Sequence, residues 1–234
     1  MAEENVNSTK PLDDFSVPWT VRDTWWGLGL FVILVLGIFL TVIFWKDVNF
    51  LQNIGLVIIE LLYLVPVLVV LARKRVPLKM LGFRPFDNQT LGIGCGLLFL
   101  SYMVIIVHNL ILSMLGFTTQ GEAIFQLFGR LENPLIFIFV GIILAPIVEE
   151  TFFRGFLFNG LRQRFGWNKA ALLSSLFFSL AHLEPVALIP TFILGYLLAY
   201  LFHRSNSLWP GVILHFLVNS VGFCMIYAVS QFNF

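Results

Sequence analysis

The fold is decided by one stretch of the chain, Ala145–Gly155, whose sequence is APIVEETFFRG. It places two adjacent carboxylates and one guanidinium within an otherwise apolar segment that is long enough to cross a membrane. A charge at the centre of a bilayer costs about 2.5–3.5 kcal/mol on insertion scales, so three such charges close together indicate a functional interior. We therefore expect this stretch to form the centre of a buried polar site.

The spacing within this stretch distinguishes the two acids. Glu150 and Arg154 are four residues apart, so they can pair on one helix face with Glu first, which is the favourable order. Glu149 is rotated by about 100° from Glu150 and can point elsewhere. Pro146 has no N–H to offer the carbonyl of Ile142, so we expect a kink just before the acids. A purely structural ion pair would explain Glu150 and Arg154 but would leave Glu149 without a partner.

The composition identifies an integral membrane protein. Hydrophobic residues make up 59% of the 234 residues and charged residues only 12%, whereas soluble domains have about 25% charged residues. The net charge of +1 gives no indication of nucleic-acid binding. The two cysteines, Cys95 and Cys224, lie in apolar runs and imply no disulfide framework.

The apolar runs predict an all-α, polytopic transmembrane helix bundle of about seven spans, with six to eight compatible with the pattern. The first apolar run is too long for the core of a cleaved signal peptide. A polar connection follows the second span, and a short amphipathic helix at the interface is expected in residues 116–133. The predicted spans are residues 25–45, 51–71, 91–115, 134–158, 170–183, 186–202 and 207–230.

The basic residues predict the orientation of the bundle. With the N-terminus inside, the cytoplasmic segments hold 11 Lys and Arg residues, and the outer loops hold only Lys46 and Arg130. We therefore expect a cytoplasmic N-terminus, and an outer C-terminus if there are seven spans, in a multi-pass protein of the cell membrane. The chain divides into a polar cytoplasmic tail (1–24), N-terminal membrane helices with their loops (25–133) and a catalytic membrane core (134–230).

Two further predicted spans carry polar pairs at helical spacing. Phe178 and His182 share a face of one span, and His215 and Asn219 share a face of another. A single histidine in an apolar helix is more often a hydrogen-bonded core residue than a functional one. However, Glu149, His182 and His215 all fall roughly 12–18 Å below the cytoplasmic surface at 1.5 Å per residue. Three ionisable groups in one layer indicate a site.

Such a layer contains the groups needed to hydrolyse an amide. Glu149, in a low dielectric, can act as the general base toward water, and neutral His182 can orient that water. His215 and Asn219 can donate hydrogen bonds to the oxyanion. The competing assignment is a divalent metal such as zinc on Glu149, His182 and His215, although the sequence has no H-E-x-x-H motif. We favour activation of water by Glu149 without a cofactor.

The motifs also resemble those of a known family. Glu149-Glu150-x-x-x-Arg154-Gly155, Phe178-x-x-x-His182 and His215-x-x-x-Asn219, with Ser207–Pro210 before the last, resemble the CPBP family. This family groups the type II CAAX prenyl endopeptidases with bacteriocin-processing and bacteriocin-immunity (Abi) membrane proteins. The resemblance covers about residues 134–221. It implies an α-helical intramembrane endopeptidase whose site residues are Glu149, Glu150, Arg154, His182, His215 and Asn219.

Three functions therefore remain open from the sequence. The favoured one is an endopeptidase of membrane-associated proteins or peptides, either CAAX-type or bacteriocin-like, with the lipid bilayer and no nucleic acid among its partners. The second is a non-catalytic immunity or scaffold protein of the same fold. The third is an ion-coupled transporter, a class that usually shows a repeated architecture with paired broken helices. Glu60, in the second span, is interpreted as a residue paired by a neighbouring helix.

Overall fold

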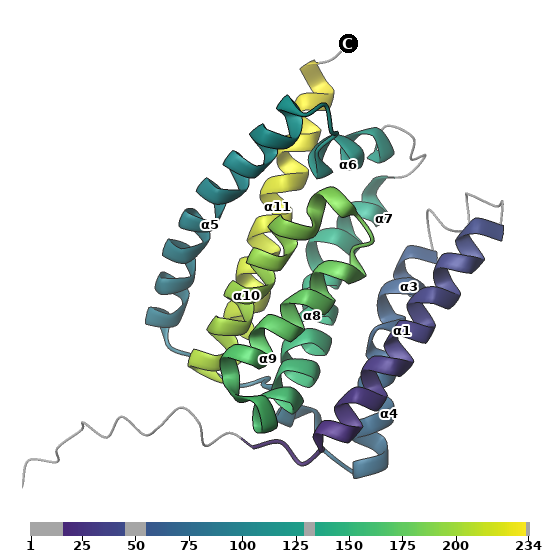
Figure 1. Cartoon of the computed structure of the whole chain (residues 1–234), viewed down its shortest axis with the longest axis vertical. Coiled ribbons are helices and arrows are strands. Elements are labelled where there is room, and N and C mark those ends of the chain that lie inside the picture. The colour runs from purple at the N-terminus through teal and green to yellow at the C-terminus, as the bar shows by residue number, and fades with distance from the viewer. Residues whose placement is uncertain (1–15, 45–54, 129–133, 233–234) are drawn as a thin grey trace, which may run out of the picture.

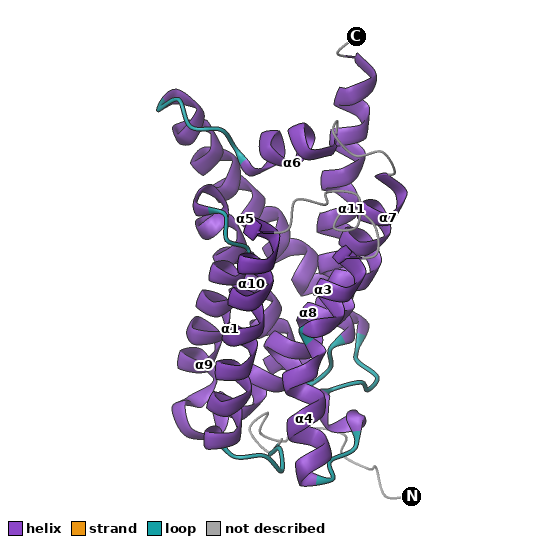
Figure 2. Ribbon diagram, turned by 90° about the vertical axis from the view of Figure 1, so that its right-hand side faces the viewer, coloured by secondary structure: helices purple, strands orange, loops and turns teal. Residues whose placement is uncertain are grey.

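The computed structural model describes residues 16–44, 55–128 and 134–232, and these residues form a helical bundle in which no β-strand occurs (Figures 1 and 2). Within them, six helical stretches are long and apolar enough to cross a membrane. The predicted all-α, multi-pass membrane architecture is thereby confirmed. The cytoplasmic location of the N-terminus stays a prediction.

The first two predicted spans form an antiparallel pair. Helix α1 (Val21–Phe44) packs along α4 (Leu64–Lys74), which follows the short helix α3 (Leu56–Leu62). Helix α1 begins earlier than predicted because Thr20 caps it: the hydroxyl of Thr20 accepts the N–H of Asp23, and the Asp23 carboxylate accepts the N–H of Thr20. Residues 45–54 of the two predicted spans lie outside the described residues.

The third predicted span is α5 (Asn88–Met114), which begins at Asp87, where the carboxylate accepts the backbone N–H of Thr90 at 2.6 Å. Helix α5 lies at the edge of the bundle against α10 and α11 (Figure 1). The helix expected in residues 116–133 is α6 (Gln120–Phe128), so the helix is confirmed. Its position at the membrane interface stays a prediction.

The predicted fourth span is one continuous helix of mixed type. It consists of α7 (Pro134–Phe139), the π-helical segment η4 (Val140–Leu144), α8 (Ala145–Glu150) and the π-helical segment η5 (Thr151–Phe158). The kink expected at Pro146 takes another form. The helix widens into the π-helical segment η4 just before the proline, where the wider turn accommodates the missing N–H.

The predicted fifth span is the second arm of this same helix. Helix α9 (Asn159–Ala181) follows η5 without a break, but Gly166 within it has φ 73° and ψ 166°, a conformation that favours glycine. The chain turns back there. The two arms lie side by side, as shown by the hydroxyl of Ser174, which donates to the carbonyl of Phe153 at 2.8 Å. The fourth and fifth predicted spans are thus two antiparallel arms of one helical stretch, which is why six stretches are found instead of seven.

The last two predicted spans complete the bundle. A 3₁₀ turn, η6 (Pro185–Ala187), leads into α10 (Leu188–Ser205), and α11 (Trp209–Phe232) follows. Asn206 ends α10 in the left-handed conformation, with its N–H bonded to the carbonyl of Phe202 at 2.7 Å. Helices α1, α4, α9 and α10 pack around η5, and all eight residues of η5 are buried.

Candidate active site

The pair between Glu150 and Arg154, expected from their spacing, is confirmed. Arg154 Nη1 lies 2.7 Å from Glu150 Oε1, and both side chains are buried. Arg154 Nη2 also donates to the carbonyl of Gly195 in α10 at 3.0 Å, and its guanidinium lies 4.4 Å from the ring centroid of Phe178. The charge of Arg154 is therefore balanced by Glu150, while its other contacts join η5 to α9 and α10.

His215 lies between the two adjacent acids. Its Nδ1 is 3.1 Å from Glu150 Oε1, and its Nε2 is 3.7 Å from Glu149 Oε2. Gly211, one turn earlier on α11, gives room for this contact, because a Cβ at that position would lie 3.0 Å from Glu150 Oε2. Helix α11 thus brings an imidazole to a pair of carboxylates that are 65 residues away in the chain.

The environments of the two acids differ sharply. Glu150 is held by Arg154 and His215. The side chain of Glu149 is 13% exposed, and its Oε2 is buried without a hydrogen-bond partner among the described residues. Glu149 therefore keeps an oxygen able to accept a proton or a hydrogen bond from a substrate or a water molecule.

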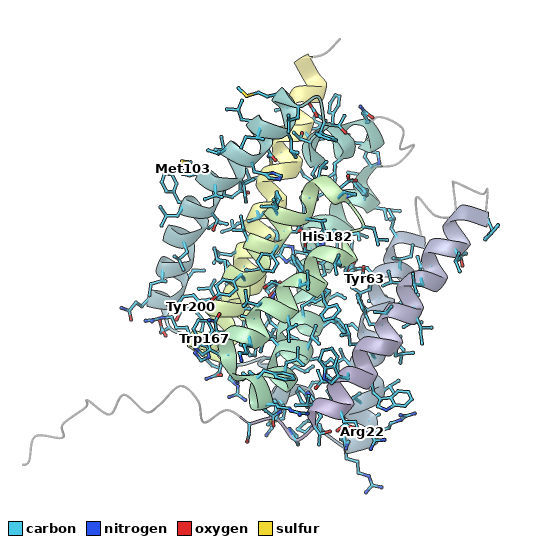
Figure 3. All side chains as sticks on the ribbon, in the orientation of Figure 1. Arg22, Tyr63, Met103, Trp167, His182 and Tyr200 are labelled. Atoms are coloured by element: carbon cyan, nitrogen blue, oxygen red, sulfur yellow. The ribbon has the colours of Figure 1, made fainter. Side chains whose placement is uncertain are left out.

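His182 joins this group through Phe178. The Nδ1 atom of His182 is 2.8 Å from the carbonyl oxygen of Phe178, and the two rings are 4.8 Å apart between centroids. The ring of Phe178 is also 5.8 Å from that of His215. A bond to a carbonyl requires Nδ1 to carry the proton, which leaves Nε2 as the acceptor of a neutral imidazole. Figure 3 shows His182 near the end of α9.

Asn219 links α11 to the π-helical segment η4 by a hydrogen bond. Its Nδ2 donates to the carbonyl of Gly141 at 2.7 Å. The second hydrogen of this amide is still able to bind another acceptor. The close approach depends on glycine, because a Cβ at Gly141 would lie 2.7 Å from the ring of Phe223. Asn219 is thus anchored at the edge of the site, one helical turn beyond His215.

Two residues not predicted as site residues, Glu60 of α3 and Tyr63 directly after α3, lie beside the site. Glu60 is buried, its Oε1 has no hydrogen-bond partner among the described residues, and its carboxylate interacts electrostatically with that of Glu149. Tyr63, three residues after Glu60, also lies within the electrostatic influence of Glu149. The interpretation of Glu60 as a residue paired by a neighbouring helix is therefore not supported, since its neighbour is a second acid. The signal that the sequence offered for Glu60 was a single charged residue in an otherwise apolar span.

The alternative of a metal centre stays a prediction. Among the described residues, no group of three His, Cys, Asp or Glu side chains was found in an arrangement that could hold an ion. The Nδ1 atoms of His182 and His215 face protein oxygens, which leaves their Nε2 atoms for other contacts.

One comparison with known protein families matches the C-terminal half of the chain. Residues 131–221 match the model of the family described as "Type II CAAX prenyl endopeptidase Rce1-like", and this segment contains all six predicted site residues. The Bacillus subtilis (strain 168) protein named "Putative membrane peptidase YdiL" is 26% identical over 105 residues, which cover 45% of this chain and 43% of that protein. The Escherichia coli protein named "Uncharacterized 24.3 kDa protein" is 36% identical over 85 residues, which cover 34% of this chain and 39% of that protein.

The matches span about two fifths of the length of these curated relatives. No solved structure matches this chain.

Proposed function

We infer, from the Rce1-like type II CAAX prenyl endopeptidase domain formed by residues 131–221, that this multi-pass membrane protein is an endopeptidase. It hydrolyses peptide bonds of membrane-associated proteins or peptides. One observation supports the assignment of the catalytic base: Glu150 is held by hydrogen bonds to two buried partners, whereas Glu149 Oε2 is buried and has no hydrogen-bond partner among the described residues. This oxygen is therefore open to a water molecule that could give up a proton to it.

In the proposed reaction Glu149 takes a proton from a water molecule while the water oxygen attacks the carbonyl carbon of the substrate. The hydroxyl stays on the new carboxyl group. Glu149 then passes the proton to the leaving nitrogen as the carbon–nitrogen bond breaks. The atoms balance with one water consumed for each bond cut, and no oxidant or cofactor is required.

The other site residues hold and polarise the reacting groups. His215 Nδ1 faces the Glu150 carboxylate, so its Nε2, 3.7 Å from Glu149 Oε2, would accept a hydrogen bond from the water and position it. The second amide hydrogen of Asn219 would donate to the developing oxyanion, and Nε2 of His182 would orient the water. The Glu150–Arg154 pair holds His215 through its Nδ1 and is a positioning element.

The substitution Glu149→Gln tests this proposal most directly. An amide has the same volume and costs little to bury, but it cannot take a proton from water. We expect product peptides in membranes to fall by roughly 10²–10⁴-fold relative to the unmodified protein, with an unchanged melting temperature. Glu122→Gln, in α6 and exposed, is the matched control and should leave the products unchanged. Undiminished turnover in a folded Glu149→Gln variant would refute the role of Glu149.

The proposed absence of a catalytic metal is tested separately. Because the proposed base, Glu149, takes the proton from water without the help of a metal, we expect strong chelators to leave turnover intact. Elemental analysis of purified, active protein should find far less than one zinc per chain. Stoichiometric zinc, with activity lost on its removal and restored on its return, would reverse the assignment.

The two alternative functions make different predictions for the same variant. A non-catalytic immunity or scaffold protein would bind its peptide and protect the cell equally well with Glu149→Gln. An ion-coupled transporter would accumulate a solute in vesicles in response to an imposed ion gradient. The same peptide comparison that tests Glu149 also identifies the substrate, and it shows whether that substrate carries a prenylated C-terminus or resembles a bacteriocin.

A further inference from the structure

A second cleft lies away from the acids, at the end of the bundle where α1 begins and α4 ends. It has a volume of ≈ 660 Å³, and its walls come from α1, α4 and the fold-back loop of α9. Three arginines line it: Arg22 of α1, Arg73 of α4 and Arg164 of α9. No Asp or Glu is among the described residues that form its walls. Figure 3 shows Arg22 at this end of the molecule.

The positive charge of this arginine cleft is not balanced by acids among the described residues. All three arginine side chains are exposed, and neither Arg22 nor Arg73 forms an ion pair with a described residue. The nearest acid in the sequence, Asp23, is already bound to Lys74 at 2.9 Å and to the N–H of Thr20 at 2.8 Å. Among the described residues, no acid balances the charge of these three arginines, so the cleft suits an anionic ligand.

The remainder of the cleft is apolar and belongs to the surface that faces lipid. Trp25, Trp26 and Ile33 line it from α1, and Val69 lines it from α4. Trp26 and Ile33 are each 67% exposed, which in a membrane helix means contact with lipid. Tryptophans are enriched at the boundary between headgroups and acyl chains. The cleft thus has a basic mouth at headgroup level and an apolar wall that continues into the bilayer.

We propose that this cleft binds one anionic phospholipid. The phosphate and the anionic headgroup lie among Arg22, Arg73 and Arg164, since the planar guanidinium pairs with phosphate oxygens in a bidentate manner. One acyl chain follows the apolar wall along α1. The cleft lies on the side of the protein that the basic loops place in the cytoplasm, where the anionic lipids of the inner leaflet are found. This binding site is separate from the proposed proteolytic site, and it does not depend on catalysis.

The first experiment uses the unmodified full-length protein. Purified protein is incubated with equimolar phosphatidylglycerol and phosphatidylcholine of the same acyl chains, and retained lipid is measured by native mass spectrometry. We expect selective retention of one phosphatidylglycerol per chain. Equal retention of the two lipids would overturn the proposal. Inorganic phosphate at the same concentration should not displace the lipid, and full displacement would show a site for free anions.

The second experiment locates the site with a matched pair of variants. The triple variant Arg22→Gln, Arg73→Gln, Arg164→Gln removes the cations of the cleft. The control Arg75→Gln, Lys79→Gln, Lys169→Gln removes three exposed cations that do not line it. The cleft variant should bind phosphatidylglycerol vesicles roughly a hundredfold more weakly, whereas the control should change little. Equal losses in the two variants would show only general attraction to an anionic surface, and would refute a specific site. If the cleft variant does not fold, the single variants Arg22→Gln and Arg73→Gln should each show a smaller loss that the control lacks.

Discussion

Helix α5 and the folded-back stretch Pro134–Ala181 are equally apolar by hydropathy, but they occupy different environments. In the most apolar 18-residue segment of each, 11% of the residues are buried in α5 and 39% are buried in Pro134–Ala181. Lipid and protein interior both accept the same aliphatic and aromatic side chains, so apolar composition places a helix in the membrane without placing it in the core. The two regions differ in the hydrogen-bond partners of their polar groups and in the space around their glycines.

The polar groups of the two regions find their partners in different places. In α5, the hydroxyl of Ser101 donates to Leu97 of the same helix at 2.9 Å. In the folded-back stretch, Ser174 donates to Phe153 across the turn, and Arg154 donates to Gly195 of another helix. In these examples the buried groups Ser174 and Arg154 bond across the bundle, whereas Ser101 bonds within its own helix. Each of the following substitutions tests that distinction.

The largest effect is expected for Arg154→Ala. It removes the guanidinium partner of the buried Glu150 and leaves the Gly195 carbonyl without its donor. We expect the free energy of unfolding to fall by about 3–5 kcal/mol, measured by denaturant unfolding in detergent. Replacing Glu150 by Gln in the same variant should recover part of this loss, because the remaining group is then neutral. A melting temperature equal to that of the unmodified protein would show that the pair contributes nothing.

Glycine to alanine substitutions should have opposite signs in the two regions. At Gly155 a Cβ would lie 2.8 Å from the backbone oxygen of Leu81, so Gly155→Ala should destabilise the protein by about 1–3 kcal/mol. At Gly96 in α5 no atom lies within 4 Å of the added Cβ. Gly96→Ala should therefore stabilise by about 0.5–1 kcal/mol through helix propensity alone. Thermal unfolding of both variants provides the measurement, and losses of the same size would contradict the distinction between the two regions.

The smallest effect is expected for a pair of serines. Ser174→Ala removes the donor of a buried bond between the two arms, and it should cost about 1 kcal/mol. Ser101→Ala removes a bond to its own helix, whose carbonyl already accepts within the helix, and it should be close to neutral. Unfolding in the same detergent compares the two variants. A larger loss for Ser101→Ala than for Ser174→Ala would contradict the distinction between the two regions.

Much of the fold was predictable from the sequence because a bilayer imposes strong local constraints. Each span must be apolar and helical, so composition alone identified a polytopic bundle, and the spans were placed to within a few residues where the structure describes them. The pair of Glu150 and Arg154 was also predictable, since residues four apart on a helix are always neighbours. The resemblance carried by Glu149–Gly155, Phe178–His182 and His215–Asn219 agrees with the matched family.

The sequence by itself thus determined the membrane class, the helices and the contacts between residues one turn apart. Tertiary structure alone decided the contacts between distant segments: His215 between the two acids, Asn219 on Gly141, and Glu60 near Glu149. The fold-back at Gly166, which joins two predicted spans into one stretch, was likewise decided only by the tertiary structure. The physical reason is that helix periodicity determines which residues share a face, but not which face of another helix meets it. That choice depends on packing, on close approach at glycines and on the need of each buried polar group for a partner.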